Sequence, residues 1–246
     1  MVINVHGGHN RIVPGASGYL DEVTEDRAVT AQVIAKLRAL GHTVYDCTDD
    51  SGRTQGQNLA NIVHACNAHA ADLDVSIHLN SGGGTGTEVL VYSDTGEAAG
   101  YAVKICAAIS DELGYRNRGV MERKNLYVLR RTTAPALLVE CCFVDSAADA
   151  QRFDADKMAA AIVRGITGQT AAQTGAAPAQ QTGYHVRITA SVLSVRRDHS
   201  ASSAVATQVR RGEVYTIVAE YNNGGTMWGK LKSGAGWIAL KYTQCV

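Results

Sequence analysis

The sequence predicts an α/β body with a twisted, mostly parallel sheet flanked by helices, followed by a small all-β domain. In residues 1–167, short apolar runs alternate with stretches of helical periodicity, which is typical of a parallel sheet covered by helices. Residues 168–183 hold small and polar side chains and indicate a linker. Residues 184–246 contain short strand-like runs separated by turns, which favours a small barrel.

The body begins with the apolar run Val2–Val5. Its first helix is expected from about Thr24 to Leu40, because apolar residues share one face and Gly41 follows as a helix-ending glycine. The other elements expected in the body are strands at Thr43–Cys47, Leu73–Leu79, Thr87–Tyr92, Tyr127–Leu129 and Ala136–Glu140 and helices at Leu59–Cys66, Glu97–Leu113 and from about Ser146 onward.

The C-terminal domain shows only strand and turn patterns. A cluster such as Asn222-Asn-Gly-Gly225 is typical of a turn between strands. The strands expected here are Val186–Thr189, Val192–Val195, Val205–Val209, Val214–Tyr221, Met227–Leu231 and Gly236–Ala239.

Composition indicates a folded chain with an uneven charge distribution. Hydrophobic residues make up 46% of the chain and charged residues 19%, which is enough for a packed core. Residues 1–167 hold 15 Lys and Arg against 20 Asp and Glu, a net charge of −5, whereas residues 184–246 hold 8 against 3, a net of +5. A basic C-terminal domain favours an anionic partner, and the charge alone leaves nucleic acid and a cell wall equally open.

Neither a membrane span nor a cysteine-built metal site is expected. No apolar run approaches the ~20 residues that a bilayer span needs, and the chain enters a strand-like run at once, without a secretory leader. The six cysteines form no C-x-x-C pair, so we expect reduced, buried thiols.

Two side chains of metal-binding type occur near the start of the body. His9 follows the first apolar run inside a glycine-rich turn, and glycines there allow a close approach of the backbone to a bound ion. Glu22 comes just before the first helix. An alternative role for Glu22 alone is to cap or balance the helix N-terminus.

Two more such side chains lie on apolar strands. In Ser76-Ile-His78-Leu-Asn80 the polar residues share one face and the apolar residues the other. Glu140 ends the run Ala136–Val139, where a buried carboxylate must be paired, protonated or facing a cavity. The plainer alternatives are a hydrogen-bonded core histidine for His78 and a salt bridge between Glu140 and an arginine such as Arg118.

Together these residues indicate a zinc hydrolase. Catalytic zinc commonly has three protein ligands and one open position, and two imidazoles with one carboxylate suit it. A further carboxylate beside the centre can take a proton from water and pass it to a leaving amine. Amide hydrolysis without a covalent intermediate is the chemistry that this set supports.

At this point the body resembles the zinc-dependent N-acetylmuramoyl-L-alanine amidases, which cleave peptidoglycan. The resemblance covers most of residues 1–167. It rests on the segments Gly8-His9, Pro14-Gly15-Ala16, Glu22, Ser76–Asn80, Arg118-Gly119, Tyr127–Arg130 and Pro135–Phe143.

The resemblance implies one Zn²⁺ per catalytic domain, bound by His9, Glu22 and His78, with Glu140 as the catalytic glutamate. It implies peptidoglycan as the partner and no nucleic acid. The candidates for substrate binding in the body are His6, Asn80 and Arg118.

The sequence departs from the family pattern around the first ligand. The family often has Asp-Pro before Gly-His, and here His6-Gly7 stands there, so that His6 competes with His9 for the ligand position. We favour His9 because Pro14-Gly15-Ala16 lies at the expected distance from it. After His9 the family often has Gly-Gly, and here Asn10-Arg11 stands there. After Glu22 it often has lysine, and here Val23 stands there. These differences put local contacts in doubt but not the ligands.

Residues 184–246 resemble bacterial SH3-like modules that target enzymes to the cell wall. The matching segments are Ala190–Arg196, Arg211-Gly-Glu213, Trp228–Lys232, Gly236–Ile238 and Tyr242. The resemblance implies wall targeting, with anionic wall polymers as a possible ligand. Tyr215, Tyr221 and Tyr242 are candidates for a shallow peptide groove, whereas Trp228 and Trp237 are favoured as core.

Three other functions stay open at this point. A zinc carboxypeptidase acting on the stem peptide uses a similar ligand set. Cys141 or Cys142 would serve as a nucleophile if its pKa were lowered. A wall-binding protein with an inactive body is the non-enzymatic alternative. The peptidoglycan amidase is the favoured hypothesis. Because we expect no secretory leader in this chain, the hypothesis suits a phage or prophage endolysin released through a pore, or an enzyme secreted by another route.

Overall fold

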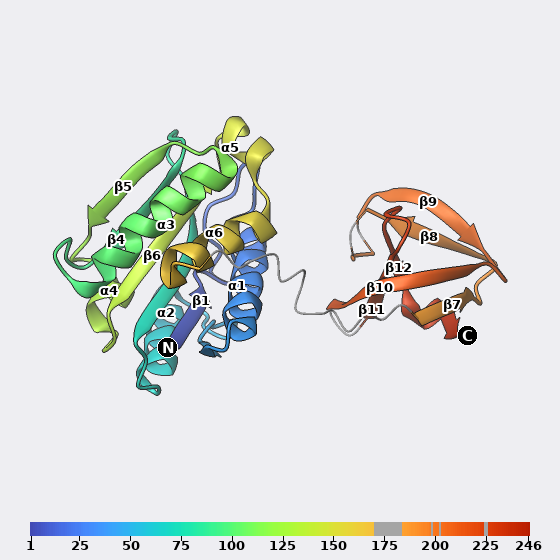
Figure 1. Ribbon diagram of the computed structural model, residues 1–246, viewed down its shortest axis with the longest axis horizontal. Helices are drawn as coiled ribbons and strands as arrows, with labels where there is room; N and C mark the ends of the chain where they lie inside the picture. Colours follow the sequence, from blue (N-terminus) through green and yellow to red (C-terminus); the bar gives the residue numbers. More distant parts are fainter. Residues whose placement is uncertain (170–183, 198, 202, 224–225) are drawn as a thin grey trace. The chain divides into compact units, whose positions relative to one another are not determined.

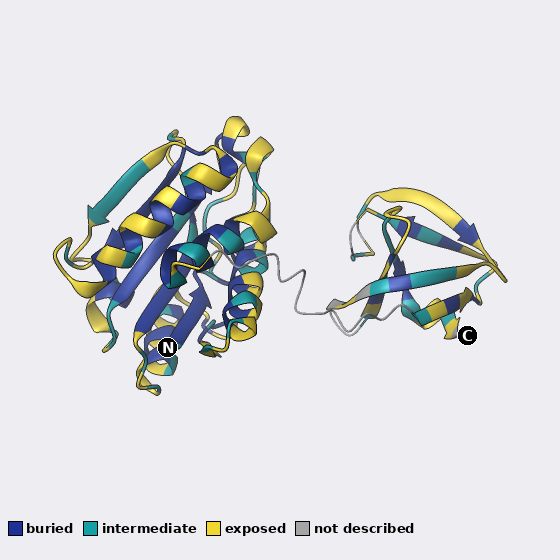
Figure 2. Cartoon of the chain, viewed as in Figure 1, coloured by how far each residue is buried: buried dark blue, intermediate teal, exposed yellow. Residues whose placement is uncertain are grey.

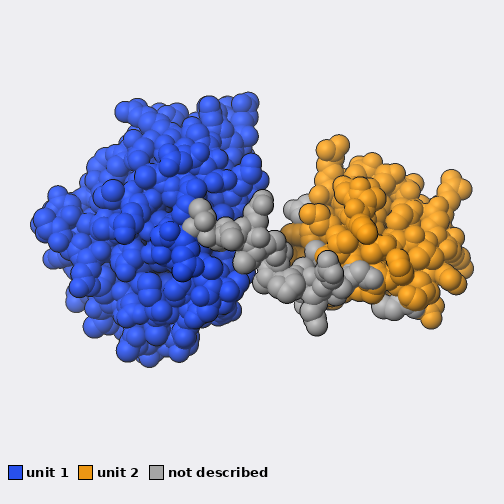
Figure 3. All heavy atoms as spheres, in the orientation of Figure 1, with its two compact units in different colours: residues 1–174 blue, residues 175–246 orange. Residues whose placement is uncertain are grey.

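The chain forms two compact units, Met1–Thr174 and Gly175–Val246 (Figure 3). The computed structural model describes residues 1–169, 184–197, 199–201, 203–223 and 226–246. Most of the linker expected at 168–183 lies outside these described residues.

The first unit is a mixed α/β domain (Figure 1). Its sheet has the strand order β2-β1-β3-β6-β4-β5, and every neighbouring pair is parallel except β4 with β6. The prediction of a parallel-rich sheet flanked by helices is thus confirmed. The elements are β1 (Val2–Gly7), α1 (Glu22–Ala39), β2 (Thr43–Asp46), α2 (Gln55–Asn67), β3 (Leu73–Asn80), β4 (Thr87–Val91), α3 (Glu97–Leu113), β5 (Asn117–Glu122), α4 (Tyr127–Arg131), β6 (Ala136–Phe143), α5 (Ala147–Arg152) and α6 (Ala155–Thr167).

Two hydrophobic clusters lie on opposite faces of this sheet. The larger joins α1, α3 and α6 to one face through residues such as Val33, Ile105 and Ile162. The smaller joins α2 and α4 to the other face through residues such as Ile62 and Val128. Figure 2 shows the central strands as mostly buried, the edge strand β5 as partly exposed and the outward faces of the helices as exposed.

The polar residues of the central strands lie on the face that carries α2 and α4. In β3, the side chains of Val75 and Ile77 join the larger cluster, so the alternate residues Ser76 and His78 point to the opposite face. In β6, Leu138 belongs to the smaller cluster, and Glu140, two residues on, shares its face. The period of two that the sequence predicted for β3 is confirmed.

Two element predictions in the body are wrong. The expected strand Tyr127–Leu129 is the short helix α4, whose Val128 and Leu129 pack into the smaller cluster. The strand that the prediction lacks is β5, at one edge of the sheet. It is polar and half-exposed, and it has no alternation of apolar residues that would have revealed it. The single helix expected from Ser146 is two helices, because Phe153 is extended and Asp154 caps a new start.

The second unit is all-β, as predicted. It is a seven-stranded sheet in the order β13-β7-β10-β11-β12-β8-β9, with a core that includes Val195, Ile217 and Ile238. The short elements Leu240–Tyr242 and Thr243–Cys245 were not predicted. Its elements are β7 (Tyr184–Ile188), β8 (Val192–Arg196), β9 (Val205–Arg210), β10 (Val214–Asn223), β11 (Thr226–Leu231), β12 (Trp237–Ala239), η1 (Leu240–Tyr242) and β13 (Thr243–Cys245).

Within the part of the chain that the structure describes, no helix combines the length and apolar character that crossing a bilayer requires. Cys47, Cys66, Cys106, Cys141 and Cys142 are buried and free of disulfides, as expected for reduced thiols.

Candidate metal centre

Three separate segments bring His9, Glu22 and His78 together. His9 lies in the loop two residues beyond β1, and Glu22 is the first residue of α1. Asp21 caps that helix by accepting a hydrogen bond from the Thr24 amide at 2.9 Å, which leaves the Glu22 side chain for other contacts. His78 lies near the carboxyl end of β3.

The donor atoms of these three side chains form a compact group. One ligand atom from each lies within 4.8 Å of the others. Glu22 Oε1 is 3.0 Å from His78 Nδ1 and 3.7 Å from His9 Nε2. The two imidazole rings meet edge to face at 5.3 Å between centroids. Two nitrogens and one carboxylate oxygen in this arrangement are a suitable ligand set for zinc.

Backbone contacts hold the carboxylate of Glu22 in place. Its Oε2 accepts a hydrogen bond from the Ala16 amide at 2.7 Å, and its Oε1 accepts one from the Leu79 amide at 3.2 Å. Asp21, and not Glu22, caps α1, so the alternative of a simple capping role for Glu22 is wrong.

Two glycines allow the segments to approach. A Cβ on Gly8 would lie 2.1 Å from His78 Cε1, and a Cβ on Gly15 would lie 2.1 Å from Glu22 Oε2. No real Cβ contact is that short, so any larger residue at either position would displace a candidate ligand.

The charges of the three groups depend on one another. Burial lowers the pKa of His9, although the Glu22 carboxylate opposes this. For His78 burial also acts to lower the pKa, but the hydrogen bond to Glu22 and the Glu140 carboxylate outweigh it, so its pKa is raised. Burial acts to raise the pKa of Glu22, and the His78 hydrogen bond and charge lower it on balance.

Glu140 lies directly beside this group. It is the register partner of His78 across the pairing of β3 with β6. Both residues line a cavity of about 250 Å³, together with His9. Burial raises the pKa of Glu140 to about 7. Its Oε2 is buried and, among the described residues, has no hydrogen-bond partner.

The expected alternative, a salt bridge between Glu140 and Arg118, is not formed. Arg118 Nε instead donates to Glu88 Oε2 at 2.6 Å, and its guanidinium lies 5.0 Å over the Phe143 ring. Asn80 Nδ2 donates to the other oxygen of Glu88 at 2.9 Å. Sequence reasoning missed Glu88, although a glutamate inside the apolar strand Thr87–Val91 was a usable signal.

His6 faces the same cavity but does not join the ligand group. It is 2% exposed, and burial lowers its pKa to about 4. Its Nδ1 is 3.2 Å from the Gly7 carbonyl oxygen and 3.5 Å from Ser76 Oγ. In the competition between the two histidines, the donor geometry favours His9.

Arg27 fixes the loop that carries His9, and sequence reasoning missed it as well. Its Nη2 donates to the His9 carbonyl oxygen and to Asp50 Oδ1, the latter at 2.8 Å. Its Nη1 donates to Asp26 Oδ1 at 2.8 Å. Arg27 thus joins α1 to two loops. Sequence periodicity carries no signal for a contact with a distant carbonyl.

The cysteine alternative does not fit the surroundings of either thiol. Cys141 and Cys142 are fully buried. Burial raises the pKa of Cys142 to about 12 and that of Cys141 well above its usual range. A cysteine nucleophile needs the opposite shift.

Two of the three candidate tyrosines of the second unit, Tyr215 and Tyr242, differ in their surroundings. Tyr242 is 43% exposed and lines a cavity in that unit. Tyr215 packs against the core of the unit, and its hydroxyl donates to Glu213 Oε2 at 3.0 Å. Of the two, only Tyr242 is placed to contact a ligand in that cavity.

These features give an α/β domain in which three side chains could hold a metal ion beside a buried carboxylate, an arrangement that metal-dependent hydrolases use. A family model described as N-acetylmuramoyl-L-alanine amidase matches residues 1–168. The chain belongs to that family.

Similar proteins include a sporulation-specific N-acetylmuramoyl-L-alanine amidase of Bacillus subtilis (strain 168). It is 30% identical over 209 residues, which cover 83% of this chain and 80% of the relative. An uncharacterized Clostridium perfringens protein is 37% identical over 154 residues, 61% of this chain and 45% of the relative. The chain thus spans about half the length of that relative.

Solved structures share the fold of the body. The catalytic domain of the CD27L endolysin, which targets Clostridia difficile, superposes with a TM-score of 0.64 at 26% sequence identity. The match covers 69% of this chain and 98% of that domain.

Proposed function

We propose that this chain is a zinc-dependent amidase that hydrolyses the bond between N-acetylmuramic acid and L-alanine in peptidoglycan. The observation that carries the proposal is the group His9, Glu22 and His78 with Glu140 in register beside it, in a chain of the amidase family.

The residues present fit a zinc ion. Their donors are two imidazole nitrogens and one carboxylate oxygen, and they come from three segments held by separate backbone contacts. The cavity that His9 and His78 line leaves one side of the group accessible to a small molecule. When bound, zinc supplies Lewis acidity, which polarises a carbonyl oxygen and makes water a nucleophile near neutral pH.

Glu140 acts as the general base in this proposal. Glu140 lines the cavity, and its Oε2, which has no hydrogen-bond partner among the described residues, accepts a proton from the attacking water. The same oxygen then donates that proton to the leaving nitrogen of the L-alanine residue. Its apolar surroundings, which include Leu90 and Leu138, limit the access of bulk water to the proton.

Asn80 and Arg118 bind the substrate outside the cavity in this proposal. Glu88 holds both side chains, and Arg118 uses only its Nε for that contact, so further N–H groups remain for a carboxylate of the stem peptide. His6 has a supporting role, because it is buried and held by Gly7 and Ser76.

For the second unit we propose a wall-targeting role as an SH3-like module. Residues 1–167 then form the catalytic domain, 168–183 a linker and 184–246 the wall-binding domain. The support is the all-β fold with its own core and the net charge of +5 on residues 184–246. The proposed site of action is the bacterial cell wall.

The experiment that tests the proposed reaction is product analysis on purified peptidoglycan. An amidase releases stem peptides with a new N-terminal L-alanine and leaves intact glycan strands. Release of a free amino acid from the far end of the stem would mean a carboxypeptidase instead. Binding to the wall with no product would make the chain a wall-binding protein.

A further inference from the structure

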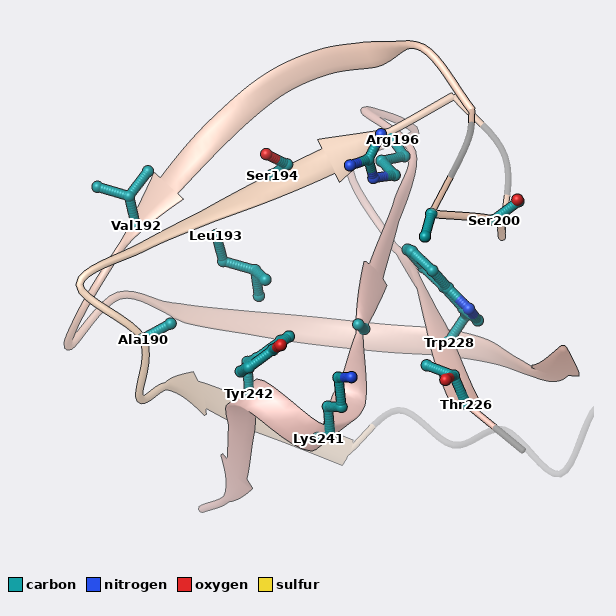
Figure 4. Close-up of a pocket in the computed structure, with 12 residues that line it drawn as sticks. Ala190, Val192, Leu193, Ser194, Arg196, Ser200, Thr226, Trp228, Lys241 and Tyr242 are labelled. Atoms are coloured by element: carbon teal, nitrogen blue, oxygen red, sulfur yellow. The ribbon is translucent and has the colours of Figure 1, made fainter. Parts of the chain in front are cut away.

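A cavity of about 680 Å³ opens in the second unit between β8, β11 and η1 (Figure 4). This volume is in the range of pockets that bind small molecules and short peptides. It lies within one unit and is separate from the candidate metal centre.

Two cations line this cavity. Figure 4 shows Arg196 on β8 and Lys241 on η1, at different edges of the opening. Among the described residues that line it there is no Asp or Glu. The Arg196 guanidinium is oriented by a hydrogen bond of 2.5 Å from Nη1 to the Ser203 carbonyl oxygen. A guanidinium has five N–H donors, so others remain for a ligand.

Apolar side chains form the rest of the wall. Val192 is 52% exposed and Tyr242 is 43% exposed, although both are large apolar residues. Leu193 and Trp228 lie deeper and are buried. Exposed apolar groups beside two cations fit a ligand that combines methyl groups with an anionic group.

We propose that this cavity binds the peptidoglycan stem peptide through its carboxylates, with Arg196 and Lys241 as the anion contacts. The inference rests on the proposed function, because it takes the polymer that the body cuts as the ligand. A stem peptide presents alanyl methyl groups to Val192 and Tyr242 and carboxylates to the two cations. A polyol-phosphate wall polymer presents anions, but it offers hydroxyl groups to the apolar wall.

Intrinsic fluorescence tests the proposal on the full chain. The chain has two tryptophans, Trp228 and Trp237, and both lie in the second unit, so their emission reports on that unit alone. The probe is the free peptide L-alanyl-D-isoglutamyl-L-lysyl-D-alanine, which contains no bond for the amidase to cut. We expect a saturable change in emission, and at least about tenfold weaker binding for the peptide with both carboxylates amidated.

Charge variants locate the binding site. Arg196→Gln and Lys241→Gln should each weaken binding about tenfold or more, whereas Lys241→Arg should bind as the wild type does. Lys241 is exposed and its Nζ lies 5.1 Å from the centroid of the Tyr242 ring, so its substitution leaves the core intact. Lys232→Gln is the matched control, because it removes an exposed cation of the same unit outside the cavity.

Three results would overturn the proposal. They are equal binding of the free and amidated peptides, loss of binding in Lys232→Gln equal to that in Lys241→Gln, and a response to a glycerol-phosphate oligomer in place of the peptide. Amidase activity on a soluble muropeptide is measured in parallel. Lost activity with intact peptide binding would contradict the proposed function and leave the cavity assignment standing.

Discussion

Gly8 sets how closely the loop after β1 approaches the His78 ring. Its Cβ would lie 2.1 Å from His78 Cε1. Gly8→Ala should therefore displace this ring and weaken zinc binding at least about tenfold, at an overpacking cost of about 1–3 kcal/mol. Competition with a chromogenic chelator measures the zinc affinity.

Gly56→Ala is the control, since a Cβ there meets nothing within 4 Å in α2. It should keep the wild-type zinc affinity and slightly stabilise the helix. An unchanged zinc affinity in Gly8→Ala would contradict the assignment of His78 as a ligand.

Asp74 gives the body a pH-dependent stability. It is 2% exposed, and burial raises its pKa from 3.8 to about 6, against the Asn4 and Thr132 hydrogen bonds. Because the folded state holds this proton more tightly, the stabilisation is full below pH 3.8 and is lost as the pH rises through 6. The free energy of unfolding should thus fall by about 3 kcal/mol over this window from Asp74 alone.

Asp74→Asn should remove this part of the pH dependence. Its Oδ1 can still accept from Asn4 Nδ2, a contact of 2.6 Å in the wild type. Denaturant unfolding of the metal-free protein at pH 4 and pH 7 measures it, with the exposed Asp111→Asn as control. Curves for Asp74→Asn and wild type that run parallel over this range would show that Asp74 does not titrate as described.

At the scale of elements, Arg27 connects α1 to the loop that carries His9. Its contacts with the His9 carbonyl oxygen, Asp26 and Asp50 hold that loop. Arg27→Gln should lower the zinc affinity by about 10- to 100-fold, because an oriented ligand becomes free to move. Isothermal titration of the metal-free protein with zinc measures the change.

Arg38→Gln is the matched control for this prediction. It removes another α1 guanidinium that bonds a backbone carbonyl, that of Val44, at 2.7 Å. Both variants lose a hydrogen bond from an α1 guanidinium to a backbone carbonyl, so a general loss of stability would affect the two alike. Equal zinc affinities in them would show that Arg27 does not position His9.

How far the sequence predicts this structure differs between elements. In β3 the apolar and polar residues alternate strictly, so both the strand and the cavity-facing side of His78 could be predicted. The residues of Tyr127–Leu129 favour a strand, yet they belong to the five-residue helix α4. In so short a segment the packing against α2 and the sheet outweighs the local preference.

The contacts that support the site were harder to predict than its candidate ligands. His78 and Glu140 were proposed because each is a polar residue on an apolar strand, and His9 and Glu22 because each lies next to an expected strand or helix and matches the motifs of the amidase family. The pairing of Glu88 with Arg118 joins residues 30 positions apart on different strands. Such a pair depends on strand order, and strand order is set by the whole sheet rather than by any local pattern.

At the scale of the molecule, the two units have separate cores, and we propose a different function for each: catalysis for the first and wall binding for the second. The hydrophobic clusters of the body and of the second unit share no residue. A chain of residues 1–169 should therefore fold and cleave a soluble muropeptide as the full chain does. Its binding to insoluble walls should weaken by about 10²-fold, because one of two binding modules is lost.

Co-sedimentation with purified walls and a soluble-substrate assay measure the two properties of the shortened chain. An equal loss of wall binding and soluble activity would point to a structural role for the second unit. Wall binding that matches the full chain would contradict a targeting role.

The most direct test of the account is zinc content measured together with amide hydrolysis in three proteins. The wild type should hold about one zinc per chain and be active. His78→Ala should lose both the zinc and the activity, whereas Glu140→Gln should keep the zinc and lose about 10²- to 10⁴-fold in kcat. Wild-type zinc content in His78→Ala, or full activity in Glu140→Gln, would contradict the central claim that these residues form the metal centre and its base.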